Sequence, residues 1–373
     1  MDVLVEGNRL PSIAGIFHER EIPYTVAVAD VNAIIEYQQA SLAKAFCKSS
    51  CIMDWTKYHR LETINKLLED LVVLFPDRCS IHGIGSSAEG REMIVLRISN
   101  GKTSNDGVWI DGAIHPREWI SPAVVAYIAD CLARTFDKQP EYITNKDWYF
   151  LPILNPDGYE YTHTSDRMWR KNRAHYGQCV GVDLNRNFSC GWGENGEEGS
   201  SSDPGNCFYR GPEPFSEPET KAVRRAIMEA NTTFKVFLSL HSYGEVIIFP
   251  WGYTEDPCSD YVELLEGGTA MAKAINKTSG RIYKVGSTKD LMYYAAGTSI
   301  DWSYGVANIP YSYMVELRDK KNRFLLPAEE ILETSLEIFN GVLNLMKFVD
   351  KRNKGTQAGS KSKAALVVTS SPV

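Results

Sequence analysis

"VWIDGAIHPREWISPAVVAYIADCLARTF", residues 108–136, holds a complete strand–turn–helix unit. Residues 108–114 form an apolar strand-like run, and 121–136 have the spacing of a helix that buries one face. Pro116 ends the strand, while Ser121 followed by proline predicts a capped helix start. A buried strand that leads directly into such a helix indicates an α/β fold.

The same pattern recurs along the chain. Further strands are expected at 92–99, 147–154, 234–240, 245–250 and 311–317. Further helices are expected at 56–75, 216–230, 261–275 and 326–349. Continuous apolar strands between helices predict one large α/β domain, with a mixed, mostly parallel twisted sheet covered by helices on both faces. In such folds, sites gather beyond the carboxyl ends of the strands.

Three zones follow from the patterning. Residues 1–50 form a small segment, with a strand expected at 22–31 and a helix at 31–46, which is too short to bury a core alone. Residues 51–351 form the main domain. Residues 352–373 are rich in Ser, Lys and Gly and are expected to be a disordered tail.

Composition excludes some functions. A net charge of -7 argues against nucleic acid or an anionic membrane as the main partner. No run of about 18 apolar residues is present to span a bilayer. The eight cysteines form no zinc-finger pattern, and both buried thiols and the disulfides of a secreted protein remain open. The first residues do not have the pattern of a signal peptide.

His115 and Glu118 lie three residues apart in the turn after the 108–114 strand. Alone, the pair is most simply a buried histidine beside an exposed turn residue. His241, which follows the apolar run 234–240, changes this interpretation. Two histidines and one glutamate leave a fourth coordination position open to water, which is the pattern of a catalytic zinc site.

Two further segments carry polar chemistry. "RMWRKNR" (167–173) and "GVDLNRNF" (181–188) supply several arginines, whose planar forks pair bidentately with carboxylates such as a chain terminus. For 167–173 alone, a solvated basic surface is the simpler explanation. Glu316 lies near the end of a strand that looks buried, where a carboxylate needs a partner or a chemical role. General base for a metal-activated water is one such role.

The motifs "HPREW", "RMWRKNR", "GVDLNRNF", "LSLHSYG", "YYAAGTSIDWSYG", "VELRD" and "FLLPAEEI" occur in this order. In that order and spacing the chain resembles the digestive metallocarboxypeptidases of the carboxypeptidase A/B family, over roughly residues 55–347. Carboxypeptidase A is itself a reference example of the two-histidine, one-glutamate zinc site. Residues 17–39 resemble the last part of that family's activation segment.

The resemblance implies a role for each matching residue. One Zn²⁺ would be held by His115, Glu118 and His241. Asp183 would orient His115, and Arg173 would polarise the scissile carbonyl. Glu316 would act as the general base and deliver the proton to the leaving amine.

Substrate recognition is implied in the same way. Asn185 and Arg186 would bind the terminal carboxylate of a peptide or protein, and Tyr293 would close over it. Arg117 and Tyr243 would contact upstream substrate residues.

Terminal-residue preference would depend on Ile300, where members that prefer arginine or lysine carry Asp. An apolar floor cannot compensate a buried cation, so aliphatic or aromatic terminal residues are expected. The remaining pocket wall would comprise Ile248, Gly252, Thr288, Ala295, Thr298 and Met314, with Lys289 and Asp290 nearby. A basic-residue carboxypeptidase and an inactive peptide-binding homologue are the alternatives.

The resemblance also implies a secreted, monomeric zymogen. A trypsin-like protease would activate it at Lys44 or Lys48, and Cys179 and Cys207 would form a disulfide.

Overall fold

A computed structural model describes residues 3–36 and 53–364, with side chains as far as Lys354. Eight strands form the main sheet, in the order β1-β2-β4-β3-β7-β10-β8-β9. They are β1 (Cys79–Ser86), β2 (Glu92–Ile98), β3 (Asp106–Asp111), β4 (Lys146–Leu151), β7 (Phe234–Ser242), β8 (Val246–Phe249), β9 (Lys284–Ser287) and β10 (Tyr311–Leu317). The four central strands β4, β3, β7 and β10 are parallel to one another, and β2 and β8 flank them in antiparallel orientation. At the edges, β1 pairs antiparallel with β2, and β9 pairs parallel with β8. A two-stranded ribbon, β5 (His175–Tyr176) and β6 (Cys179–Val180), lies outside the sheet.

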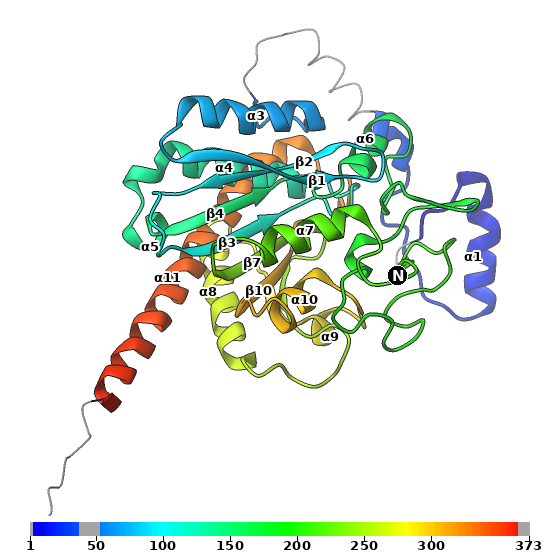
Figure 1. The fold of residues 1–373 in the computed structure, drawn as a ribbon. Coiled ribbons are helices and arrows are strands. Elements are labelled where there is room, and N and C mark those ends of the chain that lie inside the picture. Colours follow the sequence, from blue (N-terminus) through cyan, green and yellow to red (C-terminus); the bar gives the residue numbers. More distant parts are fainter. Residues whose placement is uncertain (1–2, 37–52, 365–373) are drawn as a thin grey trace, which may run out of the picture.

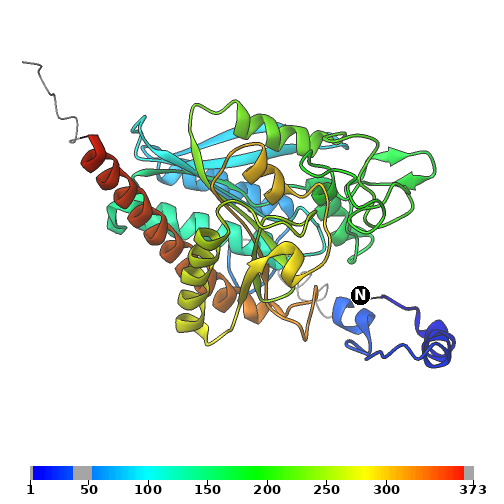
Figure 2. The same ribbon diagram turned by 90° about the horizontal axis from the view of Figure 1, so that it is seen from below.

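The larger helices cover both faces of this sheet, as Figure 2 shows. One face packs against α3 (Leu61–Leu74), α4 (Ile120–Thr135), α8 (Tyr261–Ser279) and α11 (Ile331–Ala364). The other packs against α7 (Pro218–Met228) and α10 (Ser299–Gly305). Shorter helical elements are α5 (Glu141–Thr144), α6 (Pro156–Thr164), α9 (Thr288–Leu291), η2 (Phe136–Lys138), η3 (Leu184–Arg186) and η4 (Ala328–Glu330).

Alternation along the central strands explains why they read as continuous apolar runs. In β7, Val236 and Leu238 enter the core beneath α4, while Phe237 between them enters the core on the α7 side. Successive strand residues point to opposite faces, so a strand buried on both faces needs apolar residues at nearly every position. The predicted fold class, with helices on both faces, is confirmed.

Local predictions differ from the structure in three places. Helix α4 begins at Ile120 without a side-chain cap, so the predicted Ser121 cap is wrong. Residues 22–30 form no strand; residues 31–36 are helical, and the rest of the helix expected at 31–46 lies outside the described residues. Helix α11 runs to Ala364, so the expected disordered tail from 352 begins as a continuation of this helix.

The amino-terminal segment has little contact with the sheet. η1 (Gly7–Arg9) and α1 (Leu10–Glu19) bury no residue, and α1 lies at the side of the molecule in Figures 1 and 2. The boundary at residue 50 and the expected cleavage points Lys44 and Lys48 lie outside the described residues.

A buried ion-pair cluster joins the end of β10 to α11. Arg318 is fully buried and its Nη2 lies 2.5 Å from Oε2 of the equally buried Glu337. Its Nη1 donates to Glu330 at 2.6 Å and to Glu333 at 2.8 Å. Because Arg318 follows Glu316 by two residues, this cluster anchors the strand end that carries that carboxylate.

Candidate metal and peptide site

The turn after β3 is held by Ser121. Its hydroxyl donates to the carbonyl of Glu118 at 2.9 Å and accepts from the amide of Ala113 at 2.9 Å. A Cβ at Gly112 would lie 3.1 Å from backbone atoms of Ser121 and Pro152, so only glycine fits there without displacing backbone. Ser121 therefore fixes the turn that presents His115 and Glu118, in place of capping the helix.

His241 reaches the same point from β7. Strands β3 and β7 are parallel neighbours, so their carboxyl ends lie side by side. The backbone amide of Ser242 donates to Glu118 Oε2 at 3.1 Å. Sheet pairing thus brings together two residues that are far apart in the sequence.

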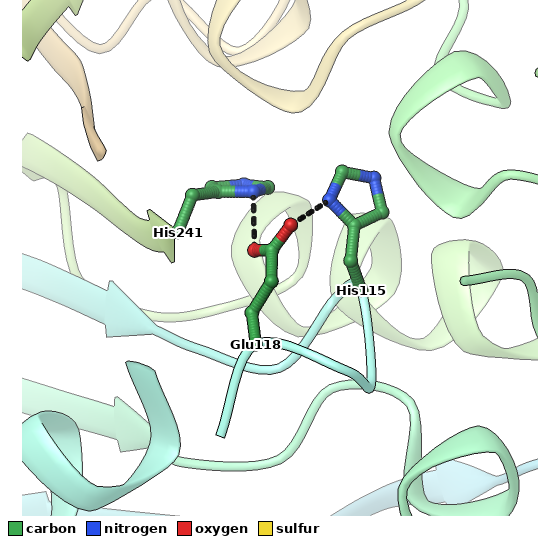
Figure 3. Close-up of side chains that lie close together, drawn as sticks. All are labelled: His115, Glu118 and His241. Atoms are coloured by element: carbon green, nitrogen blue, oxygen red, sulfur yellow. Dashed lines mark hydrogen bonds and ion pairs between the residues drawn. The ribbon is translucent and has the colours of Figure 1, made fainter. Parts of the chain in front are cut away.

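His115, Glu118 and His241, here called the His–Glu–His cluster, have the geometry of a metal site. Figure 3 shows the Glu118 carboxylate between the two imidazoles. Glu118 Oε1 lies 2.9 Å from His115 Nδ1, and Oε2 lies 3.1 Å from His241 Nδ1. One potential ligand atom from each residue lies within 4.8 Å of the others, and all three residues are buried.

The donor set of this cluster fits zinc. Two imidazole nitrogens and one carboxylate oxygen are ligands that Zn²⁺ accepts in tetrahedral sites. His241 Nδ1 is buried and has no hydrogen-bond partner of good geometry, although Glu118 lies close. A buried nitrogen in that condition is stabilised by a cation at the centre of the cluster.

Asp183 connects His115 to an arginine. His115 Nε2 lies 3.1 Å from Asp183 Oδ1, which leaves Nδ1 directed at the cluster. Arg170 donates to Asp183 Oδ2 through Nε at 3.0 Å and Nη2 at 2.7 Å. Burial opposes ionisation of Asp183, but the charge of Arg170, the hydrogen bond to His115 and the charge of Arg186 together outweigh it and hold the pKa of that carboxyl well below its usual range.

Glu316 lies directly beside His241 on the neighbouring strand β10. Burial raises the pKa of Glu316 to about 7; His241 opposes this, and the negative charge of Glu118 adds to it. A Cβ at Gly244 would lie 3.0 Å from the Cβ of Glu316, so the loop after β7 needs a glycine there to leave room for this side chain.

The two arginines of the 167–173 segment lie in different surroundings. The Arg170 side chain is only 9% exposed, and its charge acts on the pKa values of His115, Asp183 and Glu316. Arg173 instead stacks 3.7 Å above the Tyr161 ring, with Nε 3.7 Å from Glu89. The structure therefore brings Arg170, and not the expected Arg173, to the cluster.

Asn185 and Arg186 form a rigid group beyond Asp183, in η3. Arg186 donates from Nε to the carbonyl of Gly199 at 2.9 Å and from Nη1 to the carbonyl of Asn185 at 2.8 Å. The amide of Ser299 donates to Asn185 Oδ1 at 2.9 Å. The ring of Tyr293 lies 5.9 Å from the Arg186 guanidinium and is 48% exposed, so this tyrosine borders the open side of the group.

Ile300 is fully buried at the start of α10. The other residues expected around it are also buried: Ile248, Gly252, Thr288, Ala295, Thr298 and Met314. Asp301, which the sequence analysis did not single out, lies next to Ile300 and accepts from the amide of Gly252 at 3.0 Å. Burial raises the pKa of Asp301 to about 7.

Lys289 and Asp290 are engaged elsewhere. Lys289 Nζ lies 4.1 Å from the Tyr294 ring centre and 3.6 Å from Glu255. Asp290 accepts from the hydroxyl of Tyr261 at 3.3 Å. Neither contact involves the wall around Ile300.

Arg117 and Tyr243 meet at a residue that the sequence analysis did not name. The Arg117 guanidinium lies 4.0 Å above the ring of Phe324, and the Tyr243 ring packs edge-on against the same ring at 5.0 Å. Phe324 belongs to the quoted motif "FLLPAEEI", but nothing in its residue type indicated this contact.

The expected disulfide between Cys179 and Cys207 is not formed. Both are free thiols, as are the other four cysteines within the described ranges. Lys171 is affected electrostatically by both sulfurs and donates to the carbonyl of Pro204 at 2.8 Å, so an ammonium lies close to the two thiols.

Comparison with known proteins defines the class. The family model described as zinc carboxypeptidase matches residues 64–341. The chain therefore belongs to the zinc carboxypeptidase family and is a metallocarboxypeptidase, a zinc-dependent hydrolase of carboxy-terminal peptide bonds.

Particular relatives are similar over most of their length. Carboxypeptidase B of Astacus astacus is 40% identical, over 80% of this chain and 98% of its own. Carboxypeptidase A1 of Rattus norvegicus is 36% identical, over 93% of this chain and 83% of its own. A crystal structure of thrombin activatable fibrinolysis inhibitor has a TM-score of 0.85 at 34% identity, over 93% of this chain and 87% of that one.

In residues 3–36 and 53–364, no helix has the length and apolar character needed to cross a membrane.

Proposed function

We propose that this metallocarboxypeptidase removes aliphatic or aromatic residues from peptide and protein carboxy termini. His115, Glu118 and His241 hold the zinc ion, which when bound acts as a Lewis acid that activates water. The observation that carries the proposal is that four functional groups lie close together. The His–Glu–His cluster, the Glu316 carboxylate, the Arg170–Asp183 pair and the Arg186 group all lie at the carboxyl end of one sheet.

Glu316 serves as the general base. It accepts a proton from the attacking water and passes it to the departing amine. A pKa raised toward 7 suits both steps, because the carboxyl can be ionised before the attack and protonated after it. This role was expected from the sequence.

Arg170 stabilises the negative charge that develops on the scissile carbonyl oxygen. It takes the role that the sequence analysis gave to Arg173. Support comes from its burial beside Asp183 and from its electrostatic influence on Glu316 and His115. A fixed cation in a site of low dielectric is effective because it needs no reorganisation during the reaction.

Exopeptidase action requires recognition of a terminal carboxylate. Asn185 and Arg186 bind this group, and Tyr293 closes over it. Arg117 and Tyr243, joined through Phe324, contact the residues upstream of the cleaved bond. Amidation of the terminal carboxylate should therefore abolish hydrolysis of an otherwise good substrate.

Ile300 sets the terminal-residue preference. A fully buried isoleucine offers apolar contact and no charge, so a terminal phenylalanine or leucine is favoured. Asp301 does not alter this, because its carboxylate accepts from the backbone of Gly252.

Preference for basic terminal residues is the second candidate, since the relative from Astacus astacus is named carboxypeptidase B. The test is hydrolysis of matched blocked dipeptides that end in Phe or in Arg. A higher kcat/KM for the Arg substrate would reject the proposed preference. Zinc content near one per chain, with activity lost to a chelator and restored by zinc, would reject an inactive peptide-binding protein.

We also propose a secreted monomer that a trypsin-like protease activates at Lys44 or Lys48. The likeness of residues 17–39 to an activation segment supports this. Limited trypsin treatment followed by amino-terminal sequencing tests the activation site, and light scattering tests the monomeric state. Cleavage elsewhere, or a dimer mass, would reject them.

A further inference from the structure

A buried chain of polar groups lies behind His241, on the side away from the His–Glu–His cluster. His241 Nε2 lies 3.3 Å from the hydroxyl of Ser239. That hydroxyl donates to Asp111 Oδ1 at 2.6 Å, and the indole N–H of Trp109 donates to Asp111 Oδ2 at 2.8 Å. All four side chains are at most 1% exposed.

The sheet itself creates this arrangement. Asp111 on β3 and Ser239 on β7 are directly paired in register. Trp109 is two residues before Asp111, and His241 is two residues after Ser239, so alternation places all four side chains on one face of the sheet. This row of hydrogen-bonded polar groups is therefore a consequence of strand pairing.

The order of donors along this chain determines which His241 nitrogen carries the proton. The indole of Trp109 can only donate, and an ionised carboxylate can only accept. Asp111 thus receives one proton from Trp109 and one from Ser239. Ser239 has only one hydroxyl proton and has committed it to Asp111, so toward His241 its oxygen can only accept.

We propose that Asp111 and Ser239 are positioning residues that hold His241 in the tautomer with Nε2 protonated, leaving the Nδ1 lone pair for the metal. This rests on the proposed ligand set. Asp183 orients His115 by direct contact. Asp111 does not touch His241 and orients it through the hydroxyl of Ser239, which lies between them. Removing groups that orient a metal-bound histidine typically weakens metal binding about 10–100-fold.

Two substitutions disturb the chain in different ways. Ser239→Ala removes the acceptor for His241 Nε2. Asp111→Asn keeps the shape but reverses the donor order: its oxygen must face Trp109, so its amide donates to Ser239. The Ser239 proton then turns toward His241 Nε2, which favours the tautomer with the proton on Nδ1, where the metal binds.

The test is zinc affinity, measured by competition with a chromophoric chelator on the full chain. We expect about 10–100-fold weaker binding in Ser239→Ala and at least as large a loss in Asp111→Asn. Ser335→Ala is the matched control, because this buried serine only donates to a carbonyl of its own helix. Thermal unfolding of the zinc-free proteins shows whether each variant is folded.

A second readout does not depend on affinity. In the zinc-loaded wild-type protein, the His241 imidazole N–H should exchange slowly with solvent, and this protection should be lost in Ser239→Ala. Wild-type affinity in both variants, or rapid exchange in the wild type, would overturn the proposal. Wild-type zinc affinity in His241→Ala would instead overturn the ligand set on which it rests.

Discussion

Asp183 accepts from Arg170 on one oxygen, at 2.7 Å, while its other oxygen faces His115 Nε2 at 3.1 Å. One carboxylate thus orients a proposed metal ligand and anchors the cation assigned to the reacting carbonyl. Asp183 remains ionised in spite of its burial, because Arg170, His115 and Arg186 together hold its pKa well below the ordinary value.

This pairing predicts unequal effects for two neighbouring arginines. Arg170→Ala should lower kcat about 10²–10³-fold, because a fixed charge that stabilises the transition state is lost. Arg173→Ala should change kcat by less than about 10-fold, since its contacts are with Tyr161, Trp169 and Glu89. Steady-state kinetics on one peptide substrate measure both. The reverse ranking would restore the assignment made from the sequence.

Glu316→Gln should lower kcat about 10²–10⁴-fold, the usual range for loss of a general base. Zinc content and the unfolding temperature should stay close to wild type, because glutamine has nearly the same shape. Glu62→Gln, an exposed position on α3, is the control and should be fully active. Substantial activity in Glu316→Gln would remove Glu316 from the mechanism.

Activity should fall on the acid side of neutrality. The base must be ionised to accept a proton, so kcat/KM declines as pH drops through the pKa of Glu316. Burial raises that pKa to about 7 in the metal-free protein, and bound zinc lowers it by its positive charge. The acid limb of the pH profile should therefore lie between about 4.5 and 7. A flat profile across that interval would contradict the assignment.

Ile300→Asp should exchange the terminal-residue preference. A carboxylate at this buried position can pair with a terminal arginine but remains unpaired against phenylalanine. We expect the Arg-to-Phe ratio of kcat/KM to rise on the order of 10²-fold or more. Ile300→Val is the conservative control and should keep the wild-type preference. An unchanged ratio in Ile300→Asp would show that another residue sets specificity.

The ion pairs of Arg318 should differ in their contribution to stability. Glu337→Ala should destabilise the fold by about 3–5 kcal/mol, because it leaves a buried guanidinium without its buried partner. Glu333→Ala should cost less than about 1 kcal/mol, since its side chain is 57% exposed. Urea unfolding of the two variants compares them, and equal losses would contradict a dominant role for the buried pair.

Sequence patterning could predict the central strands because both of their faces are buried. The edge strands β1 and β9 were missed because they are only partly buried. Glycine, serine and polar or charged residues therefore interrupt their apolar pattern. The cap expected at Ser121 failed because its hydroxyl is used by the turn that carries Glu118.

The candidate site was predictable where a residue lies at or just beyond the carboxyl end of a strand. His115, His241 and Glu316 were identified in this way, and the structure places them together. The choice between Arg170 and Arg173 was not open to the same reasoning, because both lie in an irregular segment without periodicity. The role of Phe324, and the hydrogen bonds that link Trp109, Asp111 and Ser239, depend on contacts between distant segments. No local sequence pattern encodes such contacts.

The pairing of β3 with β7 has a consequence for how the protein is assembled. Glu118 and His241 meet only when these two strands adopt one register, and a shift by one residue would turn His241 to the opposite face. Metal capture should thus come late in folding, after the middle of the sheet has formed. Zinc retention would then report correct strand alignment, because a protein with β3 and β7 in the wrong register would not bind the ion.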